Sequence, residues 1–431
     1  MVGEAASRSR QANFLGEQCA LRKSDKRAIQ PKLFVVREPL GTVYHRAMQA
    51  YLSVAPGLLR AQNVLFMLGA GASYDHGYPL VGEFLSTKYL TWLCDQCAGM
   101  PAGQGDPAPR LAEAEQFRKT SENFEEVLSA AFETSAFYKR VLDYAHWLLG
   151  TVWEIDHCRS QLHTTVEYFG LATLMFEISH AAQCSVITFN YDTAVEDALS
   201  VFGRLLALKG APTESLYFNY GFEQPVLNVL PERTITEFIS DLPRSYPNGR
   251  VPVLKLHGSV TTLICGKCGT VHYLPMDALS PSRTGRALNA NSCKSCGDRS
   301  LQPLMVPPGK RKKIPTALDQ LWTKAQGELA SSALVVIAGY SMPEYDVEAR
   351  SMLQSALRNK NVLLIDPAPN ASAIEFLSKT AKVNLSVIRQ TTAAFLRQEL
   401  SVFAPGMVDK YAEMCAPVYL YSEKMVGHCR A

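Results

Sequence analysis

The sequence predicts an α/β protein, a Rossmann-like doubly wound parallel sheet that carries a zinc-ribbon module and a helical insertion. Three observations lead to this prediction. Short apolar runs with the length of buried strands alternate with helical patterns along much of the 431 residues, as in parallel sheets. Two Cys-x-x-Cys pairs lie close together at residues 265–268 and 293–296. A long segment of helical pattern, residues 96–182, separates the first predicted strand from the second.

The composition is that of a globular chain with no general attraction to nucleic acid or membranes. Hydrophobic residues make up 47%, charged residues 19%, and the net charge is +3, so partners must be inferred from local sites. No apolar run reaches the roughly 18 to 20 residues of a membrane span. Residues 1–32 lack the apolar core of a secretory signal, and the scattered cysteines do not suggest a disulfide framework. We expect a cytoplasmic protein with a loosely ordered N-terminal tail.

The first predicted strand, residues 64–68, runs directly into a turn of small residues. Gly69 and Gly71 allow a tight turn and a close approach of the backbone to a ligand. If a helix begins near Pro79, its exposed amides and dipole would attract a pyrophosphate. The dinucleotide fingerprint needs a third glycine where this chain has Tyr74. Taken alone, the motif is more often a simple strand-to-helix turn than a nucleotide site.

Helical patterns follow this turn. Residues 81–94 predict a helix that covers the sheet. Within the insertion, helices are predicted at residues 112–117, 124–137, 141–155 and 164–181. The histidines of the insertion lack the spacing of metal ligands and are interpreted as solvated or core residues. They are His146, His157, His163 and His180.

Polar residues follow the second predicted strand, residues 184–188. Asn190 and Asp192 come directly after it, at the carboxyl end where open α/β sheets bind ligands. The local alternative is that Asp192 merely caps the next helix, where Thr193 and Glu196 have the spacing of a capping box. The sequence around this strand leaves both interpretations open.

The remaining strands repeat the pattern of an apolar run that ends in polar or small residues. His257 follows the third strand, residues 251–256, although a lone histidine after a strand is usually a packing or turn residue. Further strands are predicted at residues 333–338, 362–366 and 385–388, with helices at 318–329, 347–357 and 392–400.

The two cysteine pairs have the spacing of a tetrahedral zinc ribbon. Four thiolates leave no open coordination position, so the metal should be structural. Disulfides are the weaker alternative, and the basic run at residues 310–313 is interpreted as a solvated loop. The predicted ligands are Cys265, Cys268, Cys293 and Cys296.

These segments predict one domain that is interrupted by insertions. The sheet is assembled from three separate stretches of chain. The predicted parts are a tail at residues 1–32, the first part of the Rossmann-like domain at 33–95, the helical insertion at 96–182, the domain continued with a connecting insertion at 183–262, the zinc ribbon at 263–306, the domain completed at 307–403 and a C-terminal tail at 404–431.

The order of these motifs resembles the sirtuin family, whose members cleave NAD at the nicotinamide–ribose bond. Each motif is weak alone, but they occur in the family's order between residues 63 and 400. The resemblance rests on Gly-Ala-Gly-Ala-Ser at 69–73, Thr-Phe-Asn-Tyr-Asp at 188–192, Leu-His-Gly-Ser at 256–259, the cysteine ribbon directly after it, and Gly-Tyr-Ser at 339–341.

The resemblance implies NAD as substrate, zinc as structural metal and a role for each matching residue. Asn190 would place a water near the ribose carbon, and His257 would be the general base for a ribose hydroxyl or for water. Ser73, Asn190 and Asp192 would line the carboxamide pocket, and Asp366 replaces an asparagine that is common in the family. Gly69, Gly71 and Ala72 would hold the diphosphate, and Gly339, Ser341 and Asp366 would face the adenosine half of NAD. The implied NAD-binding positions are Gly69, Ala70, Gly71, Ala72, Ser73, Asn190, Asp192, Gly339, Ser341 and Asp366.

Two departures favour one branch of the family. Residues 77–82 lack the Asp-Phe-Arg element of sirtuin deacylases. After the ribbon, deacylases carry a Phe-Gly-Glu strand that pairs with the acyl-lysine peptide, whereas here residues 301–306 lead into Pro307 and Pro308, two prolines that remove amide donors which this pairing would use. The pattern resembles sirtuin-like NAD hydrolases, several of which act in prokaryotic antiviral defence. The leading hypothesis is therefore hydrolysis of NAD to nicotinamide and ADP-ribose.

Two other functions stay open. One is an NAD-dependent protein-lysine deacylase or ADP-ribosyltransferase, and the other is a non-catalytic NAD or ADP-ribose sensor. Because unregulated loss of NAD is toxic, we expect a gate, provided by the helical insertion or by self-association into a homo-oligomer. Neither a membrane nor a specific nucleic acid is an expected partner.

Overall fold

The computed structural model describes residues 63–74, 77–97, 108–132, 134–158, 171–172, 174–175, 178, 183–199, 218–220, 251–274, 292–308 and 316–396. All of them belong to one compact unit, Ala50–Ala431. The predicted tails at 1–32 and 404–431 and the basic run at 310–313 lie outside the described residues.

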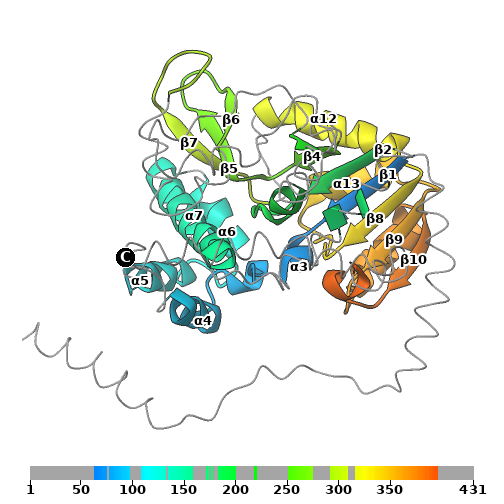
Figure 1. The fold of residues 1–431 in the computed structure, drawn as a ribbon, viewed down its shortest axis with the longest axis horizontal. Coiled ribbons are helices and arrows are strands. Elements are labelled where there is room, and N and C mark those ends of the chain that lie inside the picture. The colour runs from blue at the N-terminus through cyan, green and yellow to red at the C-terminus, as the bar shows by residue number, and fades with distance from the viewer. Residues whose placement is uncertain are drawn as a thin grey trace, which may run out of the picture. The chain divides into compact units, whose positions relative to one another are not determined.

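Seven parallel strands form the main sheet in the order β10-β9-β8-β1-β2-β4-β3 (Figure 1). The chain builds outward from β1 in both directions, which confirms the predicted doubly wound sheet. In register, Phe66 of β1 faces Val186 of β2 and Val336 of β8. The strands are β1 (Asn63–Leu68), β2 (Gln183–Thr188), β3 (Phe218–Asn219), β4 (Val251–Lys255), β8 (Leu334–Ala338), β9 (Asn361–Ile365) and β10 (Asn384–Ile388).

Strand β1 from Val64 onward and the whole of β8 are apolar, because both faces of these central strands are covered. Every residue of β1 from Val64 to Leu68 is at most 2% exposed, and β8 is buried along its whole length. The short strand β3 was not predicted. It adds an edge beside β4 from within the connecting insertion.

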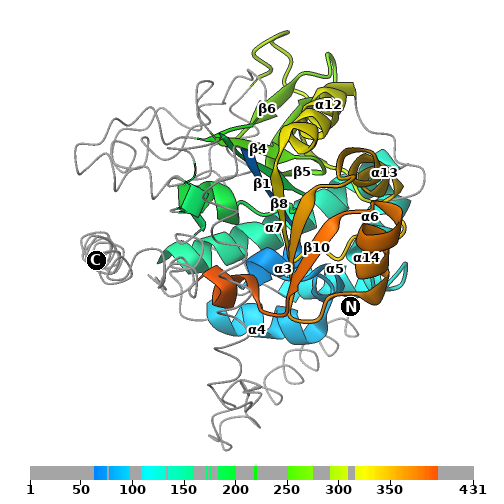
Figure 2. The same ribbon diagram turned by 90° about the vertical axis from the view of Figure 1, so that its right-hand side faces the viewer.

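Helices connect and flank the strands. Helix α12 packs on α13 and contacts β1 and β4 (Figure 2). No helix among the described residues is both long and apolar enough to cross a membrane. The helices are α3 (Ala70–Ser73), α4 (Thr87–Cys97), α5 (Ala108–Arg118), α6 (Phe124–Ala131), α7 (Ser135–Cys158), α12 (Thr316–Ser331), α13 (Val347–Ala356) and α14 (Ala371–Glu375), with a 3-10 turn η2 (Val81–Glu83) and a π turn η5 (Phe376–Thr380).

The region after β1 corrects two predicted helices. A helix begins at once after Gly69, as the short α3, and not near Pro79. The single helix predicted over residues 81–94 is a 3-10 turn followed by α4. The Glu83 carboxylate accepts the Leu80 amide at 3.1 Å, which closes the 3-10 turn as a separate unit before α4 begins.

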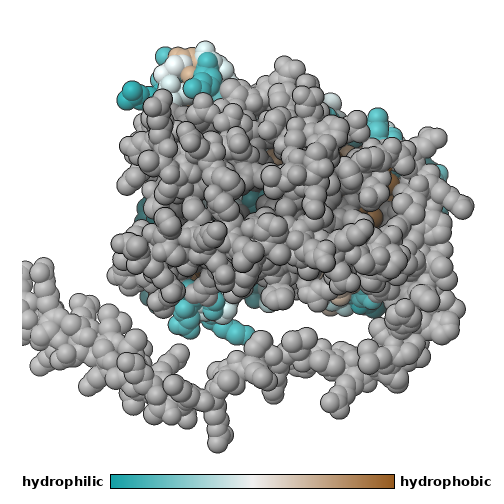
Figure 3. Space-filling view, in the orientation of Figure 1, coloured by the Kyte–Doolittle hydropathy of each residue, from teal (hydrophilic) through white to brown (hydrophobic). Residues whose placement is uncertain are grey.

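A second, antiparallel sheet carries the two cysteine pairs. Its strands are β5 (Gly258–Cys265), β6 (Val271–Tyr273) and β7 (Leu301–Met305), in the order β6-β5-β7. It starts at Gly258, before the predicted ribbon boundary at residue 263, because β5 continues from the loop that leaves β4. Helix α7 contacts β5 and β7. The sheet's tip, at the upper left of Figure 3, shows mostly hydrophilic surface, and Lys267, Lys294 and Arg299 are exposed there.

His146 in α7 lies in the core, in agreement with one of its two interpretations. The side chain is buried, and neither ring nitrogen has a hydrogen-bond partner. Burial lowers the pKa of His146 from 6.5 to about 4, since the charged ring would lose its hydration. His163 and His180 lie outside the described residues.

This histidine should make stability depend on pH. Between pH 6.5 and 4 the unfolded chain binds a proton at His146 and the folded chain does not, so stability falls as the pH falls. The expected loss is about 2 kcal/mol at pH 5 relative to pH 7. Urea unfolding of the parent and of His146→Leu at both pH values measures it. The variant should lose about 2 kcal/mol less than the parent, and equal losses in the two proteins would refute the assignment.

Candidate functional site

A cavity of about 500 Å³ lies beyond the carboxyl ends of the central strands. The order of strands reverses between β1 and β8, so the cavity occupies the topological switch point where open α/β sheets bind ligands. Ala72 and Ser73 are buried and do not belong to the lining. The predicted residues that the structure brings together in the lining are Gly69, Ala70, Gly71, Asn190, Asp192, His257, Gly339, Ser341 and Asp366.

Three glycines allow the turns after β1 and β8 to pack directly on each other. Gly69 and Gly71 donate their amides to the carbonyls of Ala338 and Gly339, both at 3.0 Å. A Cβ at Gly339, where φ is +60°, would lie 2.1 Å from the Ala72 nitrogen. A Cβ at Gly69 would lie 2.5 Å from the Gly339 oxygen. Contact between two turns, which the sequence does not reveal, therefore explains these glycines.

The same contacts occupy the amides that were predicted to hold a diphosphate. Gly69 and Gly71 donate to the neighbouring turn, and Ala72 donates to the Gly69 carbonyl at 2.9 Å. A diphosphate role for these amides stays a prediction. For a diphosphate to bind there, either these amide hydrogen bonds must break or other donors in the cavity must bind the diphosphate.

The Asn190 side chain joins the turn after β1 to the end of β2. Its Nδ2 donates to the Gly69 carbonyl at 3.0 Å and to Ser73 Oγ at 2.8 Å. Its backbone amide donates to Thr188 Oγ1 at 3.1 Å. Ser73 therefore orients the amide of Asn190 from behind the cavity wall.

Asp192 caps the next helix, residues 194–199, and its Oδ1 accepts the Ala194 amide at 3.0 Å. The predicted capping box is wrong, because Glu196 forms a buried ion pair with Lys255 at 2.8 Å between Oε1 and Nζ. The Lys255 ammonium also donates to the Asp192 carbonyl at 2.5 Å. Burial raises the pKa of the side-chain carboxyls of Asp192 and Glu196, and the positive charge of Lys255 opposes that rise.

Several polar side chains at the site were not predicted from the sequence. Lys255 interrupts an apolar strand between two leucines, which is the signal that could have identified it. Asp346 had the appearance of a simple start of helix α13, yet its Oδ2 lies 3.6 Å from His257 Nε2. Tyr340 donates its hydroxyl to the same oxygen at 2.9 Å.

The helical insertion contributes one wall of the cavity. Glu125 of α6 accepts a hydrogen bond from the Tyr345 hydroxyl at 3.0 Å, across 220 positions of sequence. The described lining contains four carboxylates and neither lysine nor arginine. Such a lining favours a ligand group that carries positive charge. The acidic residues are Glu125, Asp192, Asp346 and Asp366.

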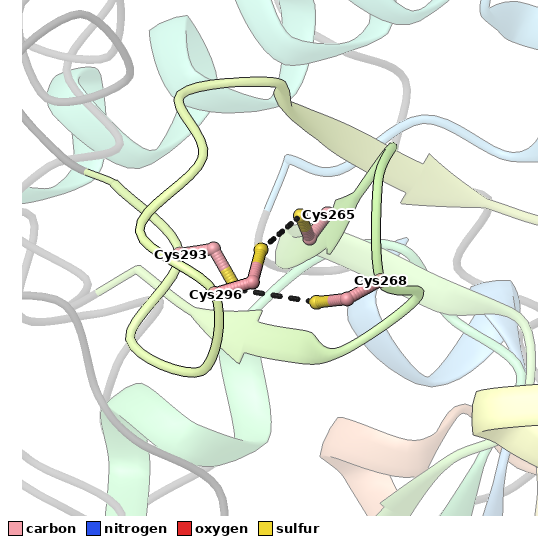
Figure 4. A group of neighbouring side chains, drawn as sticks. All are labelled: Cys265, Cys268, Cys293 and Cys296. Carbon is pink, nitrogen blue, oxygen red and sulfur yellow. Dashed lines mark hydrogen bonds between the residues drawn. The ribbon is translucent and has the colours of Figure 1, made fainter.

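The four cysteines converge at the tip of the small sheet (Figure 4). All four sulfurs lie within 4.8 Å of one another. The distances are 3.6 Å for Cys265 to Cys296 and 3.4 Å for Cys268 to Cys293. Tetrahedral zinc with bonds of about 2.3 Å places its sulfurs about 3.8 Å apart. The cluster is thus consistent with a zinc site, and the thiols are free and do not form disulfides.

Comparison with known proteins gives structural similarity alone. No family model and no curated protein matches the chain. A Sir2 homologue in complex with NAD is 12% identical, covering 83% of this chain and 94% of its own, with a TM-score of 0.40. Sir2 bound to an acetylated peptide is 12% identical, covering 82% and 97%, with a TM-score of 0.38. Sir2Tm bound to a propionylated peptide is 13% identical, covering 82% and 97%, with a TM-score of 0.37. At this level of similarity, nothing about substrate or activity follows for this chain.

Proposed function

We propose that this protein is a sirtuin-like NAD hydrolase, which cleaves the nicotinamide–ribose bond and transfers ADP-ribose to water. One observation carries the proposal. Asn190 and His257, the residues that the motif resemblance assigns to catalysis, line the same cavity at the switch point of the sheet. Ser341 and Asp366, assigned to the adenosine half of NAD, line that cavity too.

The proposed reaction needs a nucleophile, a base and a stabiliser of positive charge. The ribose–nitrogen bond breaks, and nicotinamide leaves with the electron pair. A water oxygen, placed by Asn190, bonds to the ribose carbon while its proton passes to His257 and then to solvent. The positive charge moves from the nicotinamide ring to the ribose, and the acidic lining stabilises it in both places.

The strand that sirtuin deacylases pair with an acyl-lysine peptide is engaged within this chain. In β7 and just after it, the carbonyls of Met305 and Val306 accept the hydroxyls of Tyr138 at 2.6 Å and Tyr191 at 3.1 Å. The Val306 amide donates to the His257 carbonyl at 2.8 Å. These bonds leave fewer groups for a peptide and support water as the acceptor.

We further propose a role in antiviral defence, which requires that NAD hydrolysis be controlled. The hydrogen bond from Tyr345 to Glu125 joins the helical insertion to the loop after β8 at the cavity wall. We infer that the insertion gates access to the cavity. A purified monomer that hydrolyses NAD as fast as the self-associated protein would contradict this gate.

Chromatography of nicotinamide and ADP-ribose after incubation with NAD tests the activity. The parent should release both in equal amounts, and His257→Ala and Asn190→Ala should each slow the release by about 10² to 10⁴-fold. Asn384→Ala, an exposed change on β10, should leave the rate unchanged.

Other results would identify the alternatives. Release that requires an added acetylated peptide would indicate a deacylase. A thermal shift with NAD but no product, with or without peptide and across protein concentrations, would indicate a sensor. Unchanged release by both variants would refute the assigned site.

A further inference from the structure

Asp346 stands at the start of α13, but its carboxylate does not serve the helix. An aspartate at this position usually accepts an amide of its own first turn, and here no such bond forms. The carboxylate instead accepts the Tyr340 hydroxyl at 2.9 Å and lies 3.6 Å from His257 Nε2. The Asp346 carboxylate therefore does not cap the helix and instead faces His257, the predicted base.

The surroundings of His257 make a charge partner necessary. The side chains of His257 and Asp346 are 3% and 1% exposed. A base that accepts a proton at such a depth becomes a buried cation, which is costly unless an opposite charge lies beside it. Asp346 is placed to supply that charge.

The ring of His257 is held on its other sides by aromatic groups. Phe189 contacts it edge-on at 5.1 Å and stacks on Tyr340 at 4.2 Å. Burial raises the pKa of the Tyr340 phenol well above its usual value, so the hydroxyl keeps its proton and donates to Asp346. Among the described residues, Tyr340, Tyr191 and Trp322 also face the ring or its partner. The negative charge of Glu125 in α6 lies close enough to add to the rise that burial causes in the pKa of Tyr340 and Tyr191.

We propose that Asp346 is the positioning residue of His257. Tyr340 orients the Asp346 carboxylate, and this carboxylate orients the His257 ring through Nε2. Its charge stabilises the imidazolium that forms when His257 takes a proton from water or a ribose hydroxyl. This inference rests on the proposed function for its catalytic meaning. The arrangement itself can be measured without NAD. The gap of 3.6 Å is longer than a hydrogen bond and should shorten once the ring is charged.

A titration of the histidine rings by NMR in the full chain without NAD tests the pairing. His257→Ala identifies the His257 signal by its loss. In Asp346→Asn, which keeps the size and removes the charge, the midpoint of the His257 titration should fall by about 1 pH unit or more. Glu344→Gln removes an exposed charge from the same loop and should leave the midpoint unchanged.

A second variant guards against misfolding. Tyr340→Phe removes the donor to Asp346 and leaves its charge, so the His257 midpoint should change less than in Asp346→Asn. A fall in Tyr340→Phe as large as that in Asp346→Asn, or an unchanged midpoint in folded Asp346→Asn, would overturn the proposal.

The pH profile of NAD cleavage separates this inference from the proposed function. In Asp346→Asn the acid limb should move to lower pH by the same amount as the NMR midpoint, and the plateau rate should fall at least about tenfold. If the parent cleaves no NAD but the midpoint moves, the pairing holds and the function fails. If NAD is cleaved and Asp346→Asn matches Glu344→Gln in both measurements, the pairing fails and the function holds.

Discussion

Removing the zinc that we expect in the four-cysteine cluster should unfold the small antiparallel sheet and disturb His257. The core of the tip is too small to hold itself together, since it consists of Leu263, Leu274 and Leu301 with two of the cysteines. Structural zinc contributes about 10 to 16 kcal/mol to the folding of small zinc modules. β5 begins at the residue after His257, so the loss of this sheet removes the support on one side of the cavity.

Cys293→Ser is the sharpest form of this experiment, because Cys293 is the most enclosed ligand in the second pair. We expect the variant to lose bound zinc, amide protection in β5 and β7, and NAD cleavage together. Metal analysis and hydrogen exchange measure the first two without relying on activity. Cys94→Ser, a half-buried cysteine outside the cluster, is the matched control. A metal-free Cys293→Ser protein with parental protection in β5 and β7 would show that the metal is dispensable.

Sequence reasoning identified the features whose signal is local. Buried parallel strands are continuous apolar runs, and each strand that carries a predicted site residue was found by that property. The two Cys-x-x-Cys pairs carry their chemistry in their spacing. Asn190 and His257 follow strand ends, and parallel strands bring their carboxyl ends to one edge of the sheet.

The features that were missed depend on contacts between distant segments. Glu196 fits the local pattern of a capping box, but a lysine on β4 takes its carboxylate. Asp346 fits the pattern of a helix cap, but it faces His257. Gly339 is needed because the turn after β1 packs on it. In each case the residue type has a common role in local structure, but contacts with a distant segment give it a different role.

Lys255→Met should destabilise the fold by about 3 to 5 kcal/mol. Lys255 and Glu196 are 1% and 0% exposed, so removing the ammonium leaves a carboxylate buried without its counter-charge. The Asp192 carbonyl loses its donor in the same variant. Urea unfolding of the metal-loaded protein at pH 7 measures the loss.

The exposed pair of Lys379 and Glu375 provides a matched control. Its N–O distance of 2.9 Å is close to that of the buried pair, at 2.8 Å, but its side chains are 76% and 63% exposed. Lys379→Met should therefore cost less than about 1 kcal/mol, because water screens the pair. The difference between the two lysine variants isolates the effect of burial.

The double variant Lys255→Met with Glu196→Leu decides whether the cost comes from an unpaired charge. With both charges gone, no ion remains buried, so the double variant should be more stable than Lys255→Met alone. If the losses of the single variants simply add, or if Lys255→Met costs no more than Lys379→Met, then the two buried charges do not depend on each other. The ion pair would then not be what holds the end of β2 against β4 beneath Asp192.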